Sequence, residues 1–344
     1  MSVDKKNYLV QKLHDMHLKI VHSRIHTLKT LGDLKSPCFV KREDELSFGI
    51  SGTKFRKYLS LLPRLLKDSP DHVIVIGSAF SNNVLGLSQI LIENELTPLL
   101  FLLGDSIPQP IGNFLLTSLF VPSHQIHWIP RKDWHKIEKI AFEYAKEHLS
   151  QRFLIIPEGA CMPEALPGAL TLPLDILENE KIYGNEFKNV FIESGTGLTA
   201  IAVILAFSWL QKSTQVHVLL VAGQSHIFLE RLDYFRKIFE KIMTIDLPWE
   251  GVLKRFKLHT PTLNRSFGAV NSEIFIKILN LARREGFLAD PIYSAKLFLE
   301  AEKIMDQYKL IGPNLIIHSG GALTLMGYQN QLQKALEQSV DILS

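Results

Sequence analysis

Cysteine is scarce in this sequence, which has only Cys38 and Cys161 among 344 residues. Two cysteines cannot build a disulfide framework or a four-cysteine zinc site. The 13 histidines are scattered without metal-ligand spacing, and the HExxH, CxxC, GxSxG and GxxxxGK[ST] patterns are absent. The sequence therefore gives no support to a metallohydrolase, a serine hydrolase of the GxSxG type or a P-loop NTPase, and we expect no metal.

An excess of charge and a long apolar run are also missing. The 38 basic and 35 acidic residues leave a formal charge of +3, which argues against a nucleic-acid partner. No apolar run reaches the roughly 20 residues of a membrane helix, so we expect no membrane partner. The first residues are polar and lack the apolar core of a signal peptide. These features predict a cytoplasmic protein, most simply an enzyme.

What the chain has in abundance is short, β-rich apolar runs that alternate with helical stretches. The runs lie at residues 73–77, 99–103, 153–157, 190–193, 216–223 and 315–318, with helical patterns at 55–67, 134–149 and 294–308. Runs that are apolar on both alternating faces are typical of strands in parallel sheets with helical crossovers. The length suggests about two domains. Residues 157–173, rich in proline, are predicted to be a loop, and residues 254–265 a surface connection.

The strongest local signal is SGTGLT at residues 194–199, which we call the glycine-rich loop. It follows a predicted strand and opens an apolar helix, so backbone N–H groups and the positive helix end favour a phosphate there. A plain capped turn is the alternative. The overlapping GTGLTA also fits a weak dinucleotide pattern, but the next strand does not end in the acid that binds ribose. An NAD site is therefore disfavoured but stays open.

Four further stretches stand where strands end or helices begin. They are residues 51–57 (SGTKFRK), 77–83 (GSAFSNN), 290–296 (DPIYSAK) and 314–321 (NLIIHSGG). A buried Lys54 at a helix start could be neutral and nucleophilic, although most lysines are solvated. Donors in residues 77–83 suit a carboxylate, or simply cap a helix. Tyr293 and His318 are, as residue types, more often packing residues than catalytic ones.

In this order the stretches resemble the pyridoxal-phosphate enzymes of the tryptophan-synthase β fold, and most closely the 1-aminocyclopropane-1-carboxylate deaminase and D-cysteine desulfhydrase family. Seven family motifs have collinear counterparts between residues 41 and 328. They are KREDELSFGISGTKFRKYL at 41–59, SNN at 81–83, GNFLL at 112–116, PEGA at 157–160, SGTGLT at 194–199, DPIYSAK at 290–296 and HSGG at 318–321. The resemblance implies fold type II: an α/β protein with two doubly wound parallel-sheet domains. It places residues 1–50 and 160–344 in a large cofactor domain and residues 51–159 in a small one.

The resemblance also implies roles for individual residues. Lys54 corresponds to the lysine that binds pyridoxal 5'-phosphate covalently, Tyr293 to a tyrosine that transfers protons, and Ser319 to a hydroxyl facing the pyridine nitrogen. The residues expected to bind the substrate are Ser81, Asn82, Asn83 and Tyr293, with Asn82 also beside the cofactor ring. The expected cofactor-binding residues are Lys54, Asn82, Ser194, Gly195, Thr196, Gly197, Leu198, Thr199 and Ser319. The expected catalytic residues are Lys54, Ser81 and Tyr293, with Lys54 or Ser81 taking the α-proton.

Departures from the family pattern affect the predicted chemistry. Thr53 replaces an asparagine, Asn83 replaces a histidine or glutamine, and Phe267 replaces a tyrosine. Ser294 stands where the deaminases carry a glutamate thought to face the pyridine nitrogen, so that Ser319 would be a neutral partner that leaves the ring unprotonated. We therefore predict α,β-elimination from a small, D-cysteine-like amino acid by a homodimeric enzyme, releasing a 2-oxo acid, ammonia and, from cysteine, sulfide. Deamination of 1-aminocyclopropane-1-carboxylate, or cofactor binding with degraded catalysis, are the alternatives.

Overall fold

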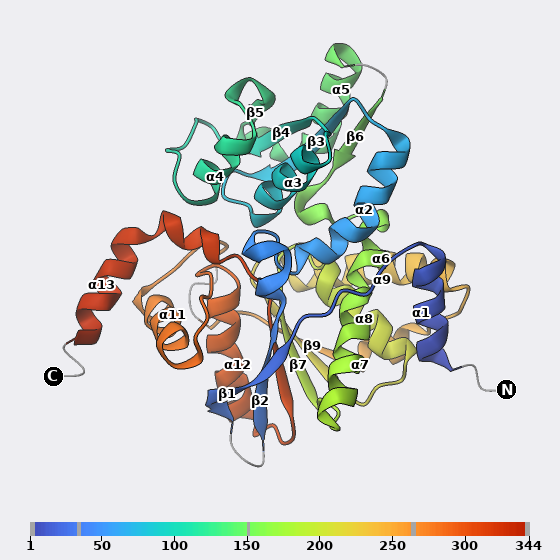
Figure 1. Cartoon of the computed structure of the whole chain (residues 1–344), viewed down its shortest axis with the longest axis vertical. Helices are drawn as coiled ribbons and strands as arrows, with labels where there is room; N and C mark the ends of the chain where they lie inside the picture. The colour runs from blue at the N-terminus through green and yellow to red at the C-terminus, as the bar shows by residue number, and fades with distance from the viewer. Residues whose placement is uncertain (1–3, 33–35, 150–151, 263–265, 341–344) are drawn as a thin grey trace.

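The computed structural model describes residues 4–32, 36–149, 152–262 and 266–340. Two lobes are visible, each built around one sheet (Figure 1). In the described residues the larger sheet has the strand order β1 (Ile25–Gly32), β2 (Pro37–Arg42), β10 (Asn314–His318), β7 (Asn189–Ser194), β8 (Gln215–Leu220) and β9 (Phe256–His259). The smaller sheet has the order β5 (Ile126–Ile129), β4 (Pro98–Leu103), β3 (His72–Ser78) and β6 (Phe153–Ile156).

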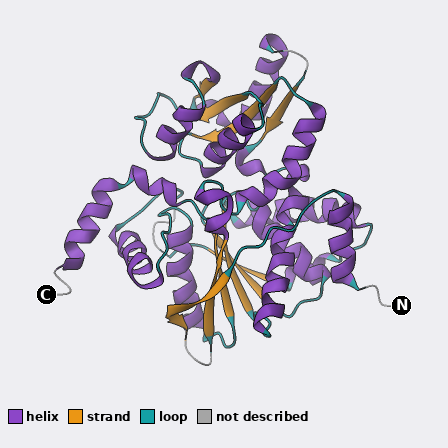
Figure 2. Cartoon of the chain, in the orientation of Figure 1, coloured by secondary structure: helices purple, strands orange, loops and turns teal. Residues whose placement is uncertain are grey.

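Helices lie on both faces of the larger sheet (Figure 2). The helices are α1 (Lys5–Asp15), α2 (Lys54–Asp68), α3 (Asn82–Glu93), α4 (Gly112–Phe120), α5 (Ile137–His148), α6 (Leu166–Ala169), α7 (Thr171–Tyr183), α8 (Leu198–Trp209), α9 (Ser225–Met243), α10 (Trp249–Leu253), α11 (Ser272–Glu285), α12 (Ser294–Tyr308) and α13 (Gln329–Val340). None of the helices in the described ranges combines the length and the apolar character needed to cross a membrane.

The predicted parallel α/β architecture is confirmed, with one exception at an edge. Every pairing in both sheets is parallel apart from β1 against β2, which is antiparallel. Strands β3, β4, β7 and β10 are almost wholly buried, as their unbroken apolar runs indicate. The carboxyl ends of such parallel strands meet at one edge of the sheet, where ligands bind in open α/β folds.

The loop prediction at residues 157–173 is wrong, and the predicted surface connection at 254–265 contains a strand. The proline-rich stretch at 157–173 is largely helical, because Pro163 and Pro167 occupy the first turns of short helices, where a missing N–H costs nothing. The stretch at 254–265 contains β9, a short edge strand that pairs with β8 from Val216–Phe256 to Leu219–His259. Residues 263–265 of that stretch lie outside the described residues.

A buried ion network fixes the start of α2 against the larger sheet. The Arg56 guanidinium bonds the Glu43 carboxylate through Nε and Nη2, at 2.5 and 2.7 Å, and reaches Asp175 at 2.7 Å. Lys41 Nζ lies 2.5 Å from the same Asp175 carboxylate, and all four side chains are fully buried. Because Arg56 is two residues from Lys54, the network also positions that lysine.

Candidate active site

Lys54 is the first residue of α2 and its side chain is half-buried. Burial lowers the pKa of its amine, and the Glu193 and Asp290 carboxyls oppose that shift. Its Nζ lies 5.9 Å from the centre of the Tyr293 ring. The amine is thus held beside an aromatic ring in surroundings that favour its neutral, nucleophilic form.

The turn before Lys54 packs on the turn that follows β10. The Thr53 N–H donates a hydrogen bond of 2.9 Å to the Ser319 carbonyl oxygen. Gly52 has a positive φ of 54°, and a Cβ there would lie 2.1 Å from the same oxygen. Only glycine fits this approach, which brings Lys54 to the carboxyl edge of the larger sheet.

The glycine-rich loop lies at the same edge, between β7 and α8. Gly197 has a φ of 100° and precedes the first turn of α8. The Leu198 side chain is fully buried, so this residue can offer a ligand only its backbone N–H. The Tyr293 ring lies over Gly195, where a Cβ would be 3.2 Å from its Cε1. The glycine-rich loop therefore lies against Tyr293, whose ring centre is 5.9 Å from Lys54 Nζ, and the first N–H groups of α8 have no acceptor within the helix.

Two cations that the sequence interpretation missed lie beside this loop. Lys57 is 4% exposed and donates to the Gly159 carbonyl at 2.9 Å, and a Cβ on Gly159 would meet Thr196 Oγ1 at 2.4 Å. Arg231 Nη1 donates to the Thr196 carbonyl at 3.0 Å. One signal for Lys57 was available, because it lies one helical turn from Lys54.

The residues predicted to bind the substrate lie at the start of α3. The Ser81 hydroxyl oxygen accepts from the N–H groups of Asn83 and Val84, as an N-cap does. Asn82 Oδ1 accepts from Asn113 Nδ2 at 2.7 Å and from Thr324 Oγ1 at 3.1 Å. The Asn82 amide nitrogen lies against Gly321, where a Cβ would be 2.7 Å away.

Asn83 lies deeper than its two neighbours, with 1% of its surface exposed. Its Oδ1 accepts a hydrogen bond of 3.1 Å from the Tyr58 hydroxyl, while its Nδ2 has no partner in the described part of the chain. Its role in substrate binding stays a prediction.

Several buried polar atoms around Lys54 have no hydrogen-bond partner among the described residues. They are Ser51 Oγ, Thr53 Oγ1, Glu193 Oε2 and Ser194 Oγ. Buried polar groups in folded proteins are normally paired, and a cluster of unpaired ones is what a bound polar group would satisfy. Phosphate, hydroxyl and ring-nitrogen groups of pyridoxal phosphate fit this set of donors and acceptors, together with a lysine amine.

Glu193 is the acid that the sequence interpretation overlooked, although it closes a buried strand just before the glycine-rich loop. Burial raises the pKa of its carboxyl to about 7, and hydrogen bonding to the Ser319 side chain opposes the shift. Glu193 therefore lies beside the hydroxyl that the resemblance places at the pyridine nitrogen, and the role of Ser319 as a neutral partner stays a prediction. Ser294 points elsewhere, since its hydroxyl donates to Asp290 Oδ2 at 2.8 Å.

His318 is a satisfied core residue, as its type favours. Its Nε2 lies 2.9 Å from the Leu288 carbonyl oxygen, its Nδ1 accepts from the Gly320 N–H, and burial lowers its pKa.

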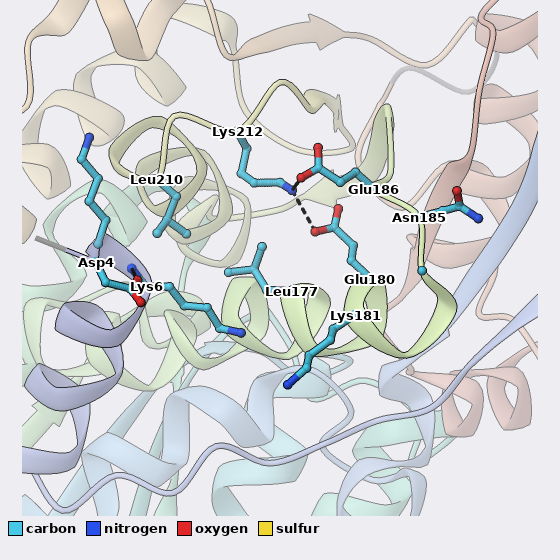
Figure 3. Close-up of a pocket in the computed structure, with 11 residues that line it drawn as sticks. Asp4, Lys6, Leu177, Glu180, Lys181, Asn185, Glu186, Leu210 and Lys212 are labelled. Carbon is cyan, nitrogen blue, oxygen red and sulfur yellow. Dashed lines mark hydrogen bonds and ion pairs between the residues drawn. The ribbon is translucent and has the colours of Figure 1, made fainter. Parts of the chain in front are cut away.

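A surface pocket of about 560 Å³ lies elsewhere, between α1 and the end of α7 (Figure 3). Its most enclosed cation, Lys212, already pairs with Glu180 and Glu186, each at 2.9 Å. The pocket thus lacks the unsatisfied groups that surround Lys54.

The chain is similar to curated proteins along most of its length. It is 23% identical over 306 residues to "Putative 1-aminocyclopropane-1-carboxylate deaminase" of Pyrococcus horikoshii, covering 88% of this chain and 90% of the relative. It is 25% identical over 323 residues to D-cysteine desulfhydrase of Serratia proteamaculans, covering 90% and 94%. No protein-family profile matches the chain.

Solved structures agree with this similarity. An ACC deaminase homologue superposes with a TM-score of 0.79 at 22% identity, covering 94% of this chain and 99% of the other. The chain has fold type II of the pyridoxal-phosphate enzymes. Diaminopropionate ammonia lyase from Escherichia coli, solved with an aminoacrylate–PLP azomethine, shares it with a TM-score of 0.64 at 12% identity, covering 97% and 92%.

Proposed function

We propose that this fold type II protein binds pyridoxal 5'-phosphate through Lys54 and catalyses α,β-elimination from a small, D-cysteine-like amino acid. The products are a 2-oxo acid and ammonia, with sulfide when the substrate is cysteine. The observation that carries the proposal is the half-buried Lys54 amine, which lies 5.9 Å from the Tyr293 ring among unpaired buried polar atoms. When bound, the cofactor draws electrons from the substrate α-carbon and makes its proton acidic.

Lys54 has two tasks in this proposal. Its amine attaches the cofactor, and once released it can accept the α-proton of the substrate. Both tasks need an unprotonated amine, and burial lowers the pKa of Lys54 accordingly.

The phosphate is held by the glycine-rich loop at the start of α8. Backbone N–H groups, the positive helix end and the hydroxyls of Ser194, Thr196 and Thr199 supply donors. Lys57 and Arg231 add positive charge next to the same loop.

Ser81 and Asn82 bind the substrate carboxylate at the start of α3. Because the Ser81 oxygen already accepts two backbone N–H groups, its hydroxyl proton is left to donate outward. This use of Ser81 as a carboxylate donor favours Lys54 over Ser81 as the base. The N-terminal end of α3 adds attraction for a carboxylate.

Tyr293 acts as a proton donor rather than a base. Burial raises the pKa of its hydroxyl, and the negative charges of Asp290, Glu193 and Glu158 add to the shift. The phenol therefore stays protonated at neutral pH and can protonate the leaving group.

The covalent attachment is tested with borohydride. Purified protein with added pyridoxal phosphate is reduced, digested and examined by mass spectrometry for a pyridoxyl group on the Lys54 peptide. Lys54→Ala is expected to lose the adduct and the yellow colour while its thermal unfolding is preserved. Lys67→Ala, an exposed lysine on the same helix, is the control and keeps both. An adduct on another lysine, or none in the wild type, refutes the assignment.

Two alternatives have their own support. Deamination of 1-aminocyclopropane-1-carboxylate is favoured by the names of similar proteins and by the retained Tyr293. A binding protein with degraded catalysis is favoured by Thr53, Asn83 and Phe267, which depart from the family pattern. Steady-state release of pyruvate, ammonia and sulfide from D-cysteine separates an enzyme from a binding protein.

A homodimer that acts in the cytoplasm is part of the same proposal. Exposed apolar side chains on α4 and the preceding loop, including Ile107 and Leu119, at 72% and 75% exposure, support a self-association surface. Light scattering after gel filtration tests it, and a monomer at micromolar concentration contradicts the dimer.

A further inference from the structure

Glu193 and Ser319 close neighbouring strands of the larger sheet. β10 pairs with β7 in parallel from Asn314–Asn189 to Ile316–Phe191, so both residues lie at the carboxyl edge where Lys54 is held. The Ser319 side chain is within hydrogen-bonding reach of the Glu193 carboxyl. Glu193 Oε2 is buried and has no hydrogen-bond partner among the residues that the structure describes.

Other buried carboxylates of this protein are well satisfied, and Glu193 differs from them. Asp290 accepts from the N–H groups of Ile292, Tyr293 and Ser294 and from the Ser294 hydroxyl. Glu43 is bonded by Arg56 and Ser23. A purely structural carboxyl with an unpaired buried oxygen costs stability, so an oxygen left unpaired at a ligand edge indicates a ligand atom.

We propose that the Glu193 carboxyl, supported by Ser319, bonds the ring nitrogen of the bound pyridine cofactor. This inference rests on the proposed function. Lys54 bonds the carbonyl carbon of the cofactor, and the glycine-rich loop binds its phosphate. The ring nitrogen and the ring hydroxyl are the groups that still need a protein partner. A carboxylate attracts a protonated ring nitrogen and repels the ring oxyanion, whereas the Asn82 amide nitrogen suits that oxyanion.

The bond sets the protonation state of the ring. The carboxyl proton passes from a Glu193 oxygen to the ring nitrogen, which leaves a carboxylate paired with a ring cation, and no other bond changes. The charged and titratable groups that face Glu193 are Lys54 on α2 and Asp290 before α12, with the Ser319 hydroxyl after β10. A protonated ring withdraws electrons more strongly than the neutral ring that Ser319 alone would leave.

The test compares pyridoxal phosphate with its analogue in which C–H replaces the ring nitrogen. Dissociation constants are measured by equilibrium dialysis for the wild type, Glu193→Gln and Ser319→Ala. The wild type is expected to prefer the natural cofactor by at least tenfold, and Glu193→Gln to reduce the preference below threefold. Glu158→Gln is the control, because this exposed acid faces the Tyr293 side of the site, and it keeps the wild-type preference.

A second measurement needs no variant and applies if Glu193→Gln does not fold. The ¹⁵N resonance of ring-labelled cofactor bound to the wild type is expected in the range of a protonated pyridine at pH 7. A neutral-pyridine resonance, or an unchanged tenfold preference in Glu193→Gln, overturns the inference. Binding of the cofactor and its analogue to the wild type with equal affinity also overturns it and leaves the proposed function intact. Failure of both compounds to bind the wild type refutes the proposed function instead.

Discussion

Gly52 packs directly against the backbone carbonyl of Ser319, so closely that a Cβ would lie 2.1 Å from the oxygen. The contact joins the turn before Lys54 to the end of β10, and the Thr53 N–H bonds the same carbonyl. The position of the candidate cofactor lysine therefore depends on a residue distant in sequence.

Gly52→Ala is expected to lower stability and to weaken cofactor binding at Lys54. The substitution combines a positive φ with a backbone clash that no side-chain rotation can relieve. Gly184→Ala is the matched control, because Gly184 has a φ of 69° but a Cβ there would meet nothing within 4 Å. We expect the control to cost about 1 kcal/mol and Gly52→Ala clearly more, by urea denaturation. Equal losses of stability in the two variants would show that the backbone at Ser319 shifts readily to make room for a Cβ at position 52.

Glu43→Gln is expected to destabilise the protein by about 3–5 kcal/mol, because it leaves the buried cations Lys41 and Arg56 with only the Asp175 carboxylate to compensate them. Glu143→Gln removes a carboxylate from an exposed pair with Lys139 and should cost less than about 1 kcal/mol. Chemical denaturation at pH 7 measures both. Similar small losses in the two variants would mean that Asp175 alone compensates Arg56.

The pH dependence of stability should carry a contribution from Lys57. Burial lowers the pKa of its amine from 10.5 to about 8, and repulsion from Lys54 adds to the shift. Between these values the unfolded chain binds more protons, so the free energy of unfolding rises with pH across this window. Below pH 8 the amine is charged in both states and the burial cost is fully present, at about 3 kcal/mol.

Lys57→Met should therefore stabilise the cofactor-free protein at pH 7. The loss of the hydrogen bond from Lys57 to the Gly159 carbonyl reduces this gain in stability. The stability difference from the wild type should shrink as the pH approaches 10.5, and cofactor affinity should fall. Lys67→Met, exposed on the same helix, should show a difference that does not change with pH. A pH-independent difference for Lys57→Met contradicts the shifted pKa.

Thr199→Val is expected to weaken cofactor retention more than it harms stability. A hydrogen bond to a charged phosphate is worth about 1.5–3 kcal/mol, which corresponds to roughly 10- to 100-fold in dissociation constant. Thr214→Val is the control, since its buried hydroxyl donates to the Phe187 carbonyl at 2.8 Å and should affect unfolding alone. Unchanged cofactor affinity in Thr199→Val would indicate that the glycine-rich loop is a structural turn and does not bind the phosphate.

Substrate choice should favour an amino acid with an α-hydrogen and a leaving group. Phe267 lies 6.0 Å from the Tyr293 ring and has no hydroxyl for the proton transfers that ring opening requires. We expect kcat/KM for D-cysteine or β-chloroalanine to exceed that for 1-aminocyclopropane-1-carboxylate by at least about tenfold, or 1.4 kcal/mol. Phe267→Tyr should narrow the ratio. Equal or reversed efficiencies in the wild type favour the deaminase alternative.

The elements that could be predicted from the sequence are those whose residues show a clear local hydrophobic pattern. The buried strands stand out as unbroken apolar runs, and α12 begins and ends where the pattern at residues 294–308 predicts. The edge strand β9 was missed because its residues are only partly buried and show no such run. The helices after Pro157 were missed because proline in a first turn looks, in sequence, like proline in a loop.

The site residues divide in the same way. Lys54, Ser81 and Tyr293 belong to motifs that the sequence displays. Glu193 belongs to none, and its importance comes from the unpaired oxygen and from the neighbouring Ser319, which are properties of packing. In the sequence, Ser294 stands where the deaminases carry an acid. In the structure its hydroxyl instead donates a hydrogen bond to the Asp290 carboxylate.

β10 lies in the middle of the larger sheet, between β2 and β7, and Cys38 is paired with Asn314. During synthesis the hairpin of β1 and β2 must wait for almost all of the chain before its partner strand exists. Such distant pairing slows folding, because the entropy cost of closing a long loop comes before the stabilising contacts form. The turn of Gly52 gains its contact with Ser319 at the same late stage. Cofactor binding at Lys54 should therefore begin only when folding is complete. In refolding experiments the cofactor colour should appear later than the helical signal.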